Sequence, residues 1–226
     1  MDAVEVFGDE FGTILNEIGD LCSARIAEQV NEFSKATDGE DSLQVVLRGH
    51  LYVEYELERL LRKNMEHPDS ILTDRFMFMN KVNLAIALGL LPKSRKNAYK
   101  KLNDLRNKYA HRLRFEVEHK DLDDFISVMD KEVRDEVFAD EFGNKVHEEI
   151  YEKDIRLKLR HAILALWVDC SRTVYLKEIQ KYQMNMDIAV ELKKRFDGDG
   201  NDKEYEDLKK AKLLALKERM EFIMSE

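Results

Sequence analysis

The chain has 226 residues, of which 37% are charged, and it carries a formal net charge of −9. Two prolines, nine glycines and long runs rich in Glu, Lys, Leu and Ala indicate an all-α protein, long enough for one large domain with appendages. An acidic chain lacks the broad basic surface that nonspecific DNA coating requires, so the composition argues against that class of function.

The two cysteines, Cys22 and Cys170, match no metal-ligand spacing and suit a reducing compartment in which thiols stay free. The first ten residues are acidic, whereas a signal peptide begins with basic residues. The longest apolar run, Leu84–Leu91, is about a third of a membrane span. We therefore expect a cytoplasmic protein with no membrane contact, no metal and no cofactor.

Apolar periodicity predicts four helices in the first half of the chain. The first covers about 10–35 and ends before Thr37-Asp38-Gly39, and the second runs from about 43 to 65 with Asp41-Ser42 as its cap. A third opens at Thr73 or Asp74 and ends around 89–92. Ser94 is expected to cap the fourth, which runs to His111.

The second half is expected to begin with a loop over 112–119 and a short helix over 121–129. Residues 133–149 are predicted to be irregular or broken helix. A long helix follows from Asp154 to about 181 and continues through 194. Its segment 162–168 is apolar all round, which indicates a helix that runs through the middle of a bundle.

Residues 197–202, DGDGND, begin like a calcium-binding loop. Position six of such a loop requires Gly and holds Asp202, and position twelve requires Glu and holds Leu208. We interpret the segment as a flexible acidic linker before a charged helix over 203–224. The predicted organisation is therefore a helical domain over 1–196, with a linker and C-terminal helix over 197–226.

Positive charge is concentrated in Lys93–Arg114, which we call the basic island. It holds nine Lys and Arg against a single acid, Asp104, or about +8 in a chain of −9. Such an island is typical of a site for phosphates of nucleic acid or nucleotide, or for an acidic partner, although a solvated Lys-rich helix is the commoner explanation of this composition. The candidate phosphate or RNA contacts are Lys96, Lys100, Lys101, Lys108 and Arg112.

Two polar residues of the second predicted helix fall within its apolar arc. At about 100° per residue, His50 and Glu54 lie in the middle of an arc that includes Leu43, Leu47 and Leu51. A carboxylate buried there must find a cationic or hydrogen-bonding partner. One interpretation is a His50–Glu54 pair satisfied within the core, and the other has Glu54 reaching across to orient Arg106.

The fourth predicted helix has two distinct faces. Ala98, Leu102, Leu105 and Tyr109 share the face expected to point into the bundle, while Asn107 and His111 share the opposite face with Lys96 and Lys100. Arg106 lies about 140° from His111 on an ideal helix. The two can serve one site if the helix ends near Ala110, or if two copies of this surface meet across a dimer axis.

Arg106, Asn107 and His111 resemble the signature of the HEPN superfamily. These proteins are helical bundles whose nuclease members carry an Arg, then a polar residue that is often Asn, and a His four to six positions after the Arg. The segments RGHLYVEYELERLL, FMNKVNLAIALGLL and LNDLRNKYAHRLRF are similar to the mannitol-repressor-like branch. The resemblance covers about 43–130 and implies a HEPN-like bundle with additional N-terminal and C-terminal helices.

The resemblance also implies a chemistry, which is metal-independent cleavage of RNA in the cleft of a homodimer. His111 would be the general acid or base, Arg106 would stabilise the charged phosphorane, and Asn107 would orient one of them, with His50 and Glu54 in support. Such a protein would act as a toxin or defence effector, and a cognate antitoxin or other regulatory partner is expected.

Two other classes of function fit the same residues. The mannitol-repressor-like branch includes proteins regarded as regulators, so a non-catalytic transcriptional regulator or an RNA-binding module is one alternative. The other is an assembly subunit whose basic island docks an acidic partner.

Overall fold

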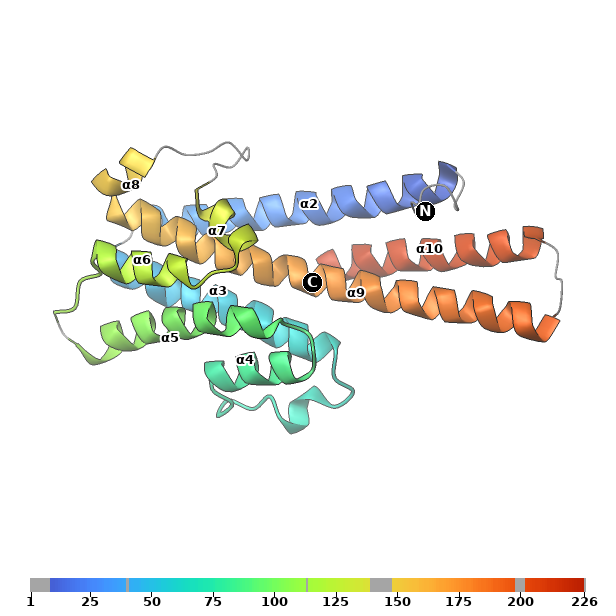
Figure 1. Ribbon diagram of the computed structural model, residues 1–226, viewed down its shortest axis with the longest axis horizontal. Coiled ribbons are helices and arrows are strands. Elements are labelled where there is room, and N and C mark those ends of the chain that lie inside the picture. Colours follow the sequence, from blue (N-terminus) through green and yellow to red (C-terminus); the bar gives the residue numbers. More distant parts are fainter. Residues whose placement is uncertain (1–8, 40, 113, 139–147, 198–201, 226) are drawn as a thin grey trace. The chain divides into compact units, whose positions relative to one another are not determined.

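The computed structural model describes residues 9–39, 41–112, 114–138, 148–197 and 202–225. Every element in these ranges is helical, so the all-α fold expected from the composition is confirmed (Figure 1). None of the described helices is both long enough and apolar enough to cross a bilayer. The α-helices are α2 (Asp9–Thr37), α3 (Ser42–Lys63), α4 (Phe78–Ala87), α5 (Lys96–His111), α6 (His119–Ser127), α7 (Lys131–Val137), α8 (Glu148–Lys153), α9 (Ile155–Asp197) and α10 (Asp202–Ser225), and the 3-10 helices are η1 (Pro68–Ser70) and η2 (Lys93–Arg95).

Most predicted helices agree with α2, α3, α5, α6, α9 and α10 to within a few residues. The predicted start of the third helix is wrong, because α4 begins at Phe78 with Met77 as its N-cap residue. Ser94 does not cap the fourth helix either. Its hydroxyl donates to Asp130 Oδ2 at 3.0 Å instead, and the chain enters α5 through η2 without a side-chain cap.

Two predicted irregular segments fall partly outside the described residues. The segment expected to be broken helix over 133–149 contains most of α7 and the start of α8, and 139–147 between them is outside the described ranges. The predicted acidic linker begins at Asp197, which is the last residue of α9, and Asp202 is the first residue of α10. Residues 198–201 between them lie outside the described ranges.

The chain divides into two compact units, and the division falls within α2 and α9. We call 30–174 the central unit, and 1–29 with 175–226 the terminal unit. The sequence predicted a boundary near 196 instead, with the last helix as an appendage. The division differs because α10 shares a hydrophobic core with parts of α2 and α9.

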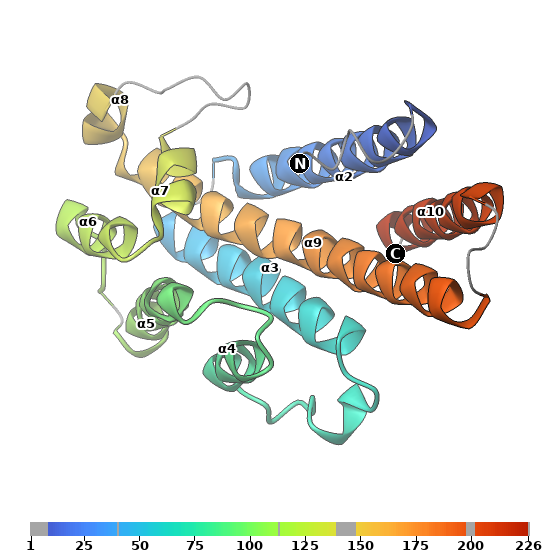
Figure 2. The same ribbon diagram turned by 45° about the vertical axis from the view of Figure 1, so that its right-hand side comes forward.

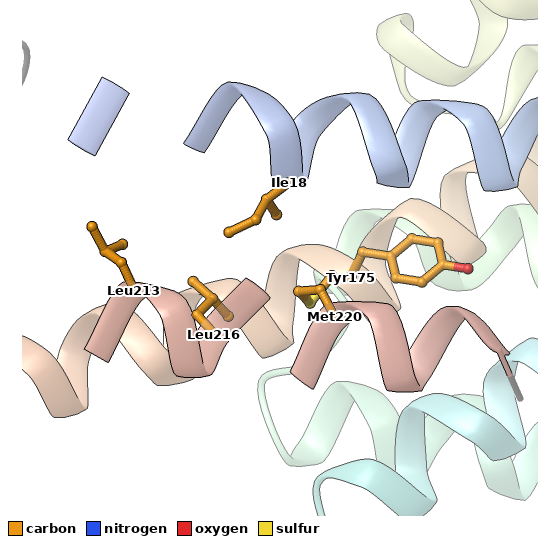
Figure 3. Close-up of a cluster of buried hydrophobic side chains, with 5 residues drawn as sticks. All are labelled: Ile18, Tyr175, Leu213, Leu216 and Met220. Atoms are coloured by element: carbon orange, nitrogen blue, oxygen red, sulfur yellow. The ribbon is translucent and has the colours of Figure 1, made fainter. Parts of the chain in front are cut away.

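Figure 3 shows the core of the terminal unit, in which each helix contributes buried side chains. Ile18 comes from α2, Tyr175 from α9, and Leu213, Leu216 and Met220 from α10. Lys217 Nζ of α10 also lies 2.6 Å from Glu17 Oε2 of α2. The spacing of Leu213, Leu216 and Met220 places them on one face of α10, so the burial follows from helical periodicity.

In the central unit, α3, α4 and α5 lie side by side, as the two views in Figures 1 and 2 show. Asp41 caps α3 as predicted, because its carboxylate accepts a hydrogen bond from Gln44 N at 2.8 Å. The apolar segment of α9 is buried, also as predicted. Trp167 stacks on Phe33 of α2, and Tyr52 of α3 meets both rings edge-on.

Gly49 lies where α3 passes close to Ile163 of α9. A Cβ atom built on Gly49 would overlap Cγ2 of Ile163, which is attached to the first side-chain carbon and cannot swing away. Only glycine therefore lets these two helices pack at this separation.

The buried face of α3 is rotated relative to the predicted apolar arc. Glu56, expected on the polar side, is buried and accepts a hydrogen bond from Arg59 Nη1 at 3.3 Å. Leu43, Leu47 and Leu51, expected in the apolar arc, are exposed. The rotation follows from the contacts of Gly49 and Tyr52 with α9, which turn that side of α3 inward.

Gly49→Ala should destabilise the central unit by about 1–3 kcal/mol, since overpacking against Ile163 outweighs the better helix propensity of alanine. Denaturant unfolding followed by circular dichroism measures this. The control is Gly19→Ala in α2, where a Cβ atom meets nothing within 4 Å and a gain of about 1 kcal/mol is expected. Equal effects at the two positions would contradict the close packing at Gly49.

Candidate functional site

The basic island forms α5, and the packing of this helix fixes which of its residues face outward. Ala98, Leu102 and Leu105 are buried, which confirms the predicted inward face. Tyr109 is half-buried, and its hydroxyl accepts a hydrogen bond from Val117 N at 3.2 Å. The exposed side of α5 includes Lys96, Lys100 and His111.

Arg106 and His111 lie on different sides of α5. The helix is continuous from Lys96 to His111, so five residues separate the two side chains by about 140° around the axis. Arg106 is half-buried and its Nη1 donates to Asn107 Oδ1 at 3.2 Å, whereas His111 is exposed in the last turn. The helix does not end before His111, so the geometry of a single chain does not bring these two groups together.

A partly buried ion-pair cluster joins α3 and α4. Lys81 of α4 has a side chain only 9% exposed, and its Nζ donates to Glu54 Oε1 at 2.8 Å and to Glu58 Oε2 at 2.9 Å. Burial lowers the pKa of Lys81, but the hydrogen bonds to the two carboxylates outweigh it and the net pKa is raised. The hydrogen bond from Lys81 is also the main reason why the pKa of Glu58 is lowered.

His50 lies beside this cluster and is almost fully buried. Its Nδ1 is 3.7 Å from Glu54 Oε2, and its ring centroid is 4.2 Å from that of Phe78. The pKa of His50 is lowered, and burial is the largest cause. The charges of Arg106 and Lys81 lower this pKa further. The Glu54 carboxylate and a hydrogen bond with the Asn103 side chain act in the opposite direction. No hydrogen bond of good geometry from the described residues reaches Nε2. Burial therefore favours the neutral form of the ring and lowers the pKa of His50, in a position close enough to Arg106 for its charge to act on the ring.

Of the two interpretations proposed from the sequence, the His50–Glu54 pair is present at 3.7 Å, and no contact between Glu54 and Arg106 occurs in the part of the chain that the structure describes. The sequence missed a third partner, because Lys81 Nζ lies closer to Glu54, at 2.8 Å. The expectation that this carboxylate must find a cationic partner is confirmed. A sequence signal for Lys81 does exist, because this residue falls on the apolar face of α4 with Phe78, Val82 and Ala85.

The island offers fewer available cations than its composition suggests. Lys101 Nζ lies 3.3 Å from Asp124 Oδ2, and Lys108 Nζ lies 2.6 Å from Asp121 Oδ1. Burial raises the pKa of Asp121, but the hydrogen bonds from Lys108 and from the backbone of Glu118 outweigh it, so the net pKa is lowered. The remaining candidate contacts, Lys96, Lys100 and Arg112, are exposed.

A second polar cluster anchors the start of α5 to α9. Arg95 Nη1 lies 2.8 Å from Asp169 Oδ2 and donates to Thr173 Oγ1 at 3.2 Å. Burial raises the pKa of Asp169 to about 6 despite the nearby guanidinium. The contacts join residues of one core, so we assign this cluster a structural role.

No group of three or more His, Cys, Asp or Glu side chains in the described ranges is arranged to hold a metal ion. The chain was compared with protein-family models, with curated proteins and with solved structures, and none of the three comparisons found a match.

Lys81→Met should destabilise the central unit by about 2 kcal/mol, because the half-buried Glu54 loses its closest cation and Glu58 keeps only Arg62. Adding Glu54→Gln should recover part of the loss. Lys101→Met is the control, since its ion pair is exposed and should contribute less than about 1 kcal/mol. Equal losses in the two single variants, measured by urea unfolding, would contradict the role given to Lys81.

The lowered pKa of His50 predicts a pH dependence of stability. The folded state favours the neutral ring, so His50 contributes to the free energy of unfolding at neutral pH. This contribution is lost as the pH falls below the ordinary histidine pKa of about 6.5, because the unfolded chain then binds a proton more readily than the folded one. His50→Gln should therefore lose less stability than the wild type between pH 7.5 and 5.5. Urea midpoints at the two pH values measure this, with His67→Gln as an exposed control.

Proposed function

We propose that the protein is a metal-independent endoribonuclease of the HEPN type that acts as a cytoplasmic toxin or defence effector. The fold-level part of this proposal is a HEPN-like bundle with extra helices at both ends. The proposal is supported by the half-buried Arg106–Asn107 pair, in which the Arg106 charge is close enough to act on His50. The pair lies on the same helix as the exposed Lys96, Lys100 and His111.

In the proposed reaction the ribose 2′-hydroxyl attacks the adjacent phosphorus and the bond from phosphorus to the 5′ oxygen breaks. His111 takes the proton from the nucleophile or gives one to the leaving oxygen, and Arg106 stabilises the negative charge of the phosphorane. Asn107 fixes the guanidinium through its hydrogen bond. The products are a 2′,3′-cyclic phosphate and a 5′-hydroxyl end.

Exposed cations next to these groups support an RNA substrate. Lys96 and Lys100 share a face of α5 with His111, and Arg112 follows directly after it. A short row of cations gives local contacts to phosphates, and the acidic remainder of the chain opposes extended binding. Because such an effector would damage its own cell, the proposal includes a cognate antitoxin or other regulatory partner.

A second candidate is a non-catalytic regulator or RNA-binding module. It is favoured by the separation of Arg106 and His111 on α5 and by the acids of α6 that already neutralise Lys101 and Lys108. This candidate predicts salt-dependent binding of RNA or of an acidic partner without turnover.

The ribonuclease proposal predicts that the purified chain cleaves RNA in the presence of EDTA. Arg106→Ala and His111→Ala should each lower the cleavage rate by about 10²–10⁴, because each removes a group that acts in the transition state. Gel analysis of a labelled RNA under single-turnover conditions measures the rates.

Lys93→Ala is the matched control for that assay, since Lys93 is an exposed cation at the start of the island and has no assigned part in the chemistry. It should retain cleavage to within a few fold. Salt-sensitive RNA binding with no cleavage by the wild type would instead select the regulator.

A further inference from the structure

Helix α6 lies beside α5 and brings two carboxylates to the basic island (Figures 1 and 2). Asp121 pairs with Lys108 and Asp124 pairs with Lys101, each through a direct contact between a carboxylate oxygen and Nζ. A phosphate oxygen makes the same kind of contact with a lysine, because both groups are oxyanions that accept charge-assisted hydrogen bonds. The two acids therefore occupy positions at which an RNA phosphate would otherwise bind.

Apolar burial, rather than these two ion pairs, holds α6 in place. The helix buries Leu122, Phe125 and Ile126, and a third acid, Asp123, pairs with Lys158 of α9 at 2.7 Å. Ion pairs that stay in contact with solvent contribute little to stability. The docking of α6 therefore does not require its other two acids to face lysines of the island.

The paired lysines form one of two cationic rows on α5. At about 100° per residue, Lys96, Lys100 and His111 lie within an arc of about 60°, and Lys101 and Lys108 lie together about 100° further round the helix. Both rows are on the polar side of α5, opposite its buried residues. With both rows available, the island would offer phosphates a wider surface than one row does.

We propose that Asp121 and Asp124 determine which cations of the island bind phosphate. By occupying Lys101 and Lys108, they confine phosphates to the row of Lys96 and Lys100, and they hold the affinity of this surface below the value that its composition would give. The two acids act only through these lysines. The choice of RNA as ligand rests on the proposed function, whereas the competition between carboxylate and phosphate does not.

Binding of a labelled single-stranded RNA oligonucleotide to the full chain tests this role. Its riboses carry 2′-O-methyl groups, which block the proposed nucleophile, so the probe stays intact during the measurement. The Asp121→Asn/Asp124→Asn variant should bind about tenfold more tightly than the wild type at about 0.1 M salt. The slope of log affinity against log salt should steepen by about 1.4, because two further phosphate contacts release counterions.

Asp135→Asn is the control for this measurement. It removes an exposed negative charge from α7 and leaves both ion pairs between α5 and α6 in place. Its salt slope should equal that of the wild type.

A quadruple variant separates release of the lysines from a general loss of negative charge. Adding Lys101→Met and Lys108→Met to the double variant removes both ion pairs and keeps the net charge of the wild type. The affinity and the salt slope should then return to the wild-type values. An unchanged slope in the double variant, a gain that persists without the lysines, or no binding by either protein would overturn the proposal.

Circular dichroism identifies any variant that fails to fold. Asp121 is the position at risk, because its carboxylate also accepts a hydrogen bond from Glu118 N at 3.2 Å. Asp124→Asn with and without Lys101→Met then carries the test. The slope should steepen by about 0.7 in the first and return to the wild-type value in the second.

Cleavage assays with an all-ribose substrate separate this proposal from the proposed function. The expected changes in slope without any cleavage by the wild type would remove the ribonuclease function and leave the role of α6 standing. Cleavage by the wild type, together with an unchanged slope in the double variant, would remove the role of α6 and leave the ribonuclease function standing.

Discussion

The contact between Lys81 and the carboxylates of Glu54 and Glu58 is the interaction on which the arrangement of the candidate site depends. It places one positive and two negative charges between two helices that also bury Leu57, Phe78 and Val82. A partly buried charge of this kind contributes little net stability compared with apolar packing, but removing Lys81 is costly because Glu54 loses its closest cation and Glu58 keeps only Arg62. The cluster therefore fixes how α3 and α4 align, and with them the environment of His50.

That environment explains why Arg106 differs from the other cations of its helix. Lys96 and Lys100 extend into solvent, whereas Arg106 is half-buried close enough to His50 for its charge to lower the pKa of that ring. The guanidinium of Arg106 is held by Asn107, and Lys81 binds the nearby Glu54 carboxylate. A guanidinium in a fixed position is suited to a phosphate group.

The helices and the orientation of α5 could be predicted from the sequence, because both follow from the 3.6-residue period and from burial of Ala98, Leu102 and Leu105. The pairing of His50 with Glu54 also followed from their spacing on one helix, but the contact of Glu54 with Lys81 could not be predicted, since it required knowing which residue of α4 faces α3. The rotated face of α3 was missed for a related reason. Apolar periodicity gives only an approximate direction for a buried face, and the direction found in the fold depends on close approaches such as that of Gly49 to Ile163. The HEPN-like assignment and the ribonuclease function stay predictions.

The most direct test of the central claim is cleavage of an RNA oligonucleotide in EDTA, compared with the same oligonucleotide carrying a 2′-deoxyribose at the cleaved position. The account predicts that the wild-type chain cleaves the all-ribose substrate to a 2′,3′-cyclic phosphate and a 5′-hydroxyl end, and that it leaves the modified linkage intact. Equal cleavage of both substrates, or cleavage of neither, would contradict it.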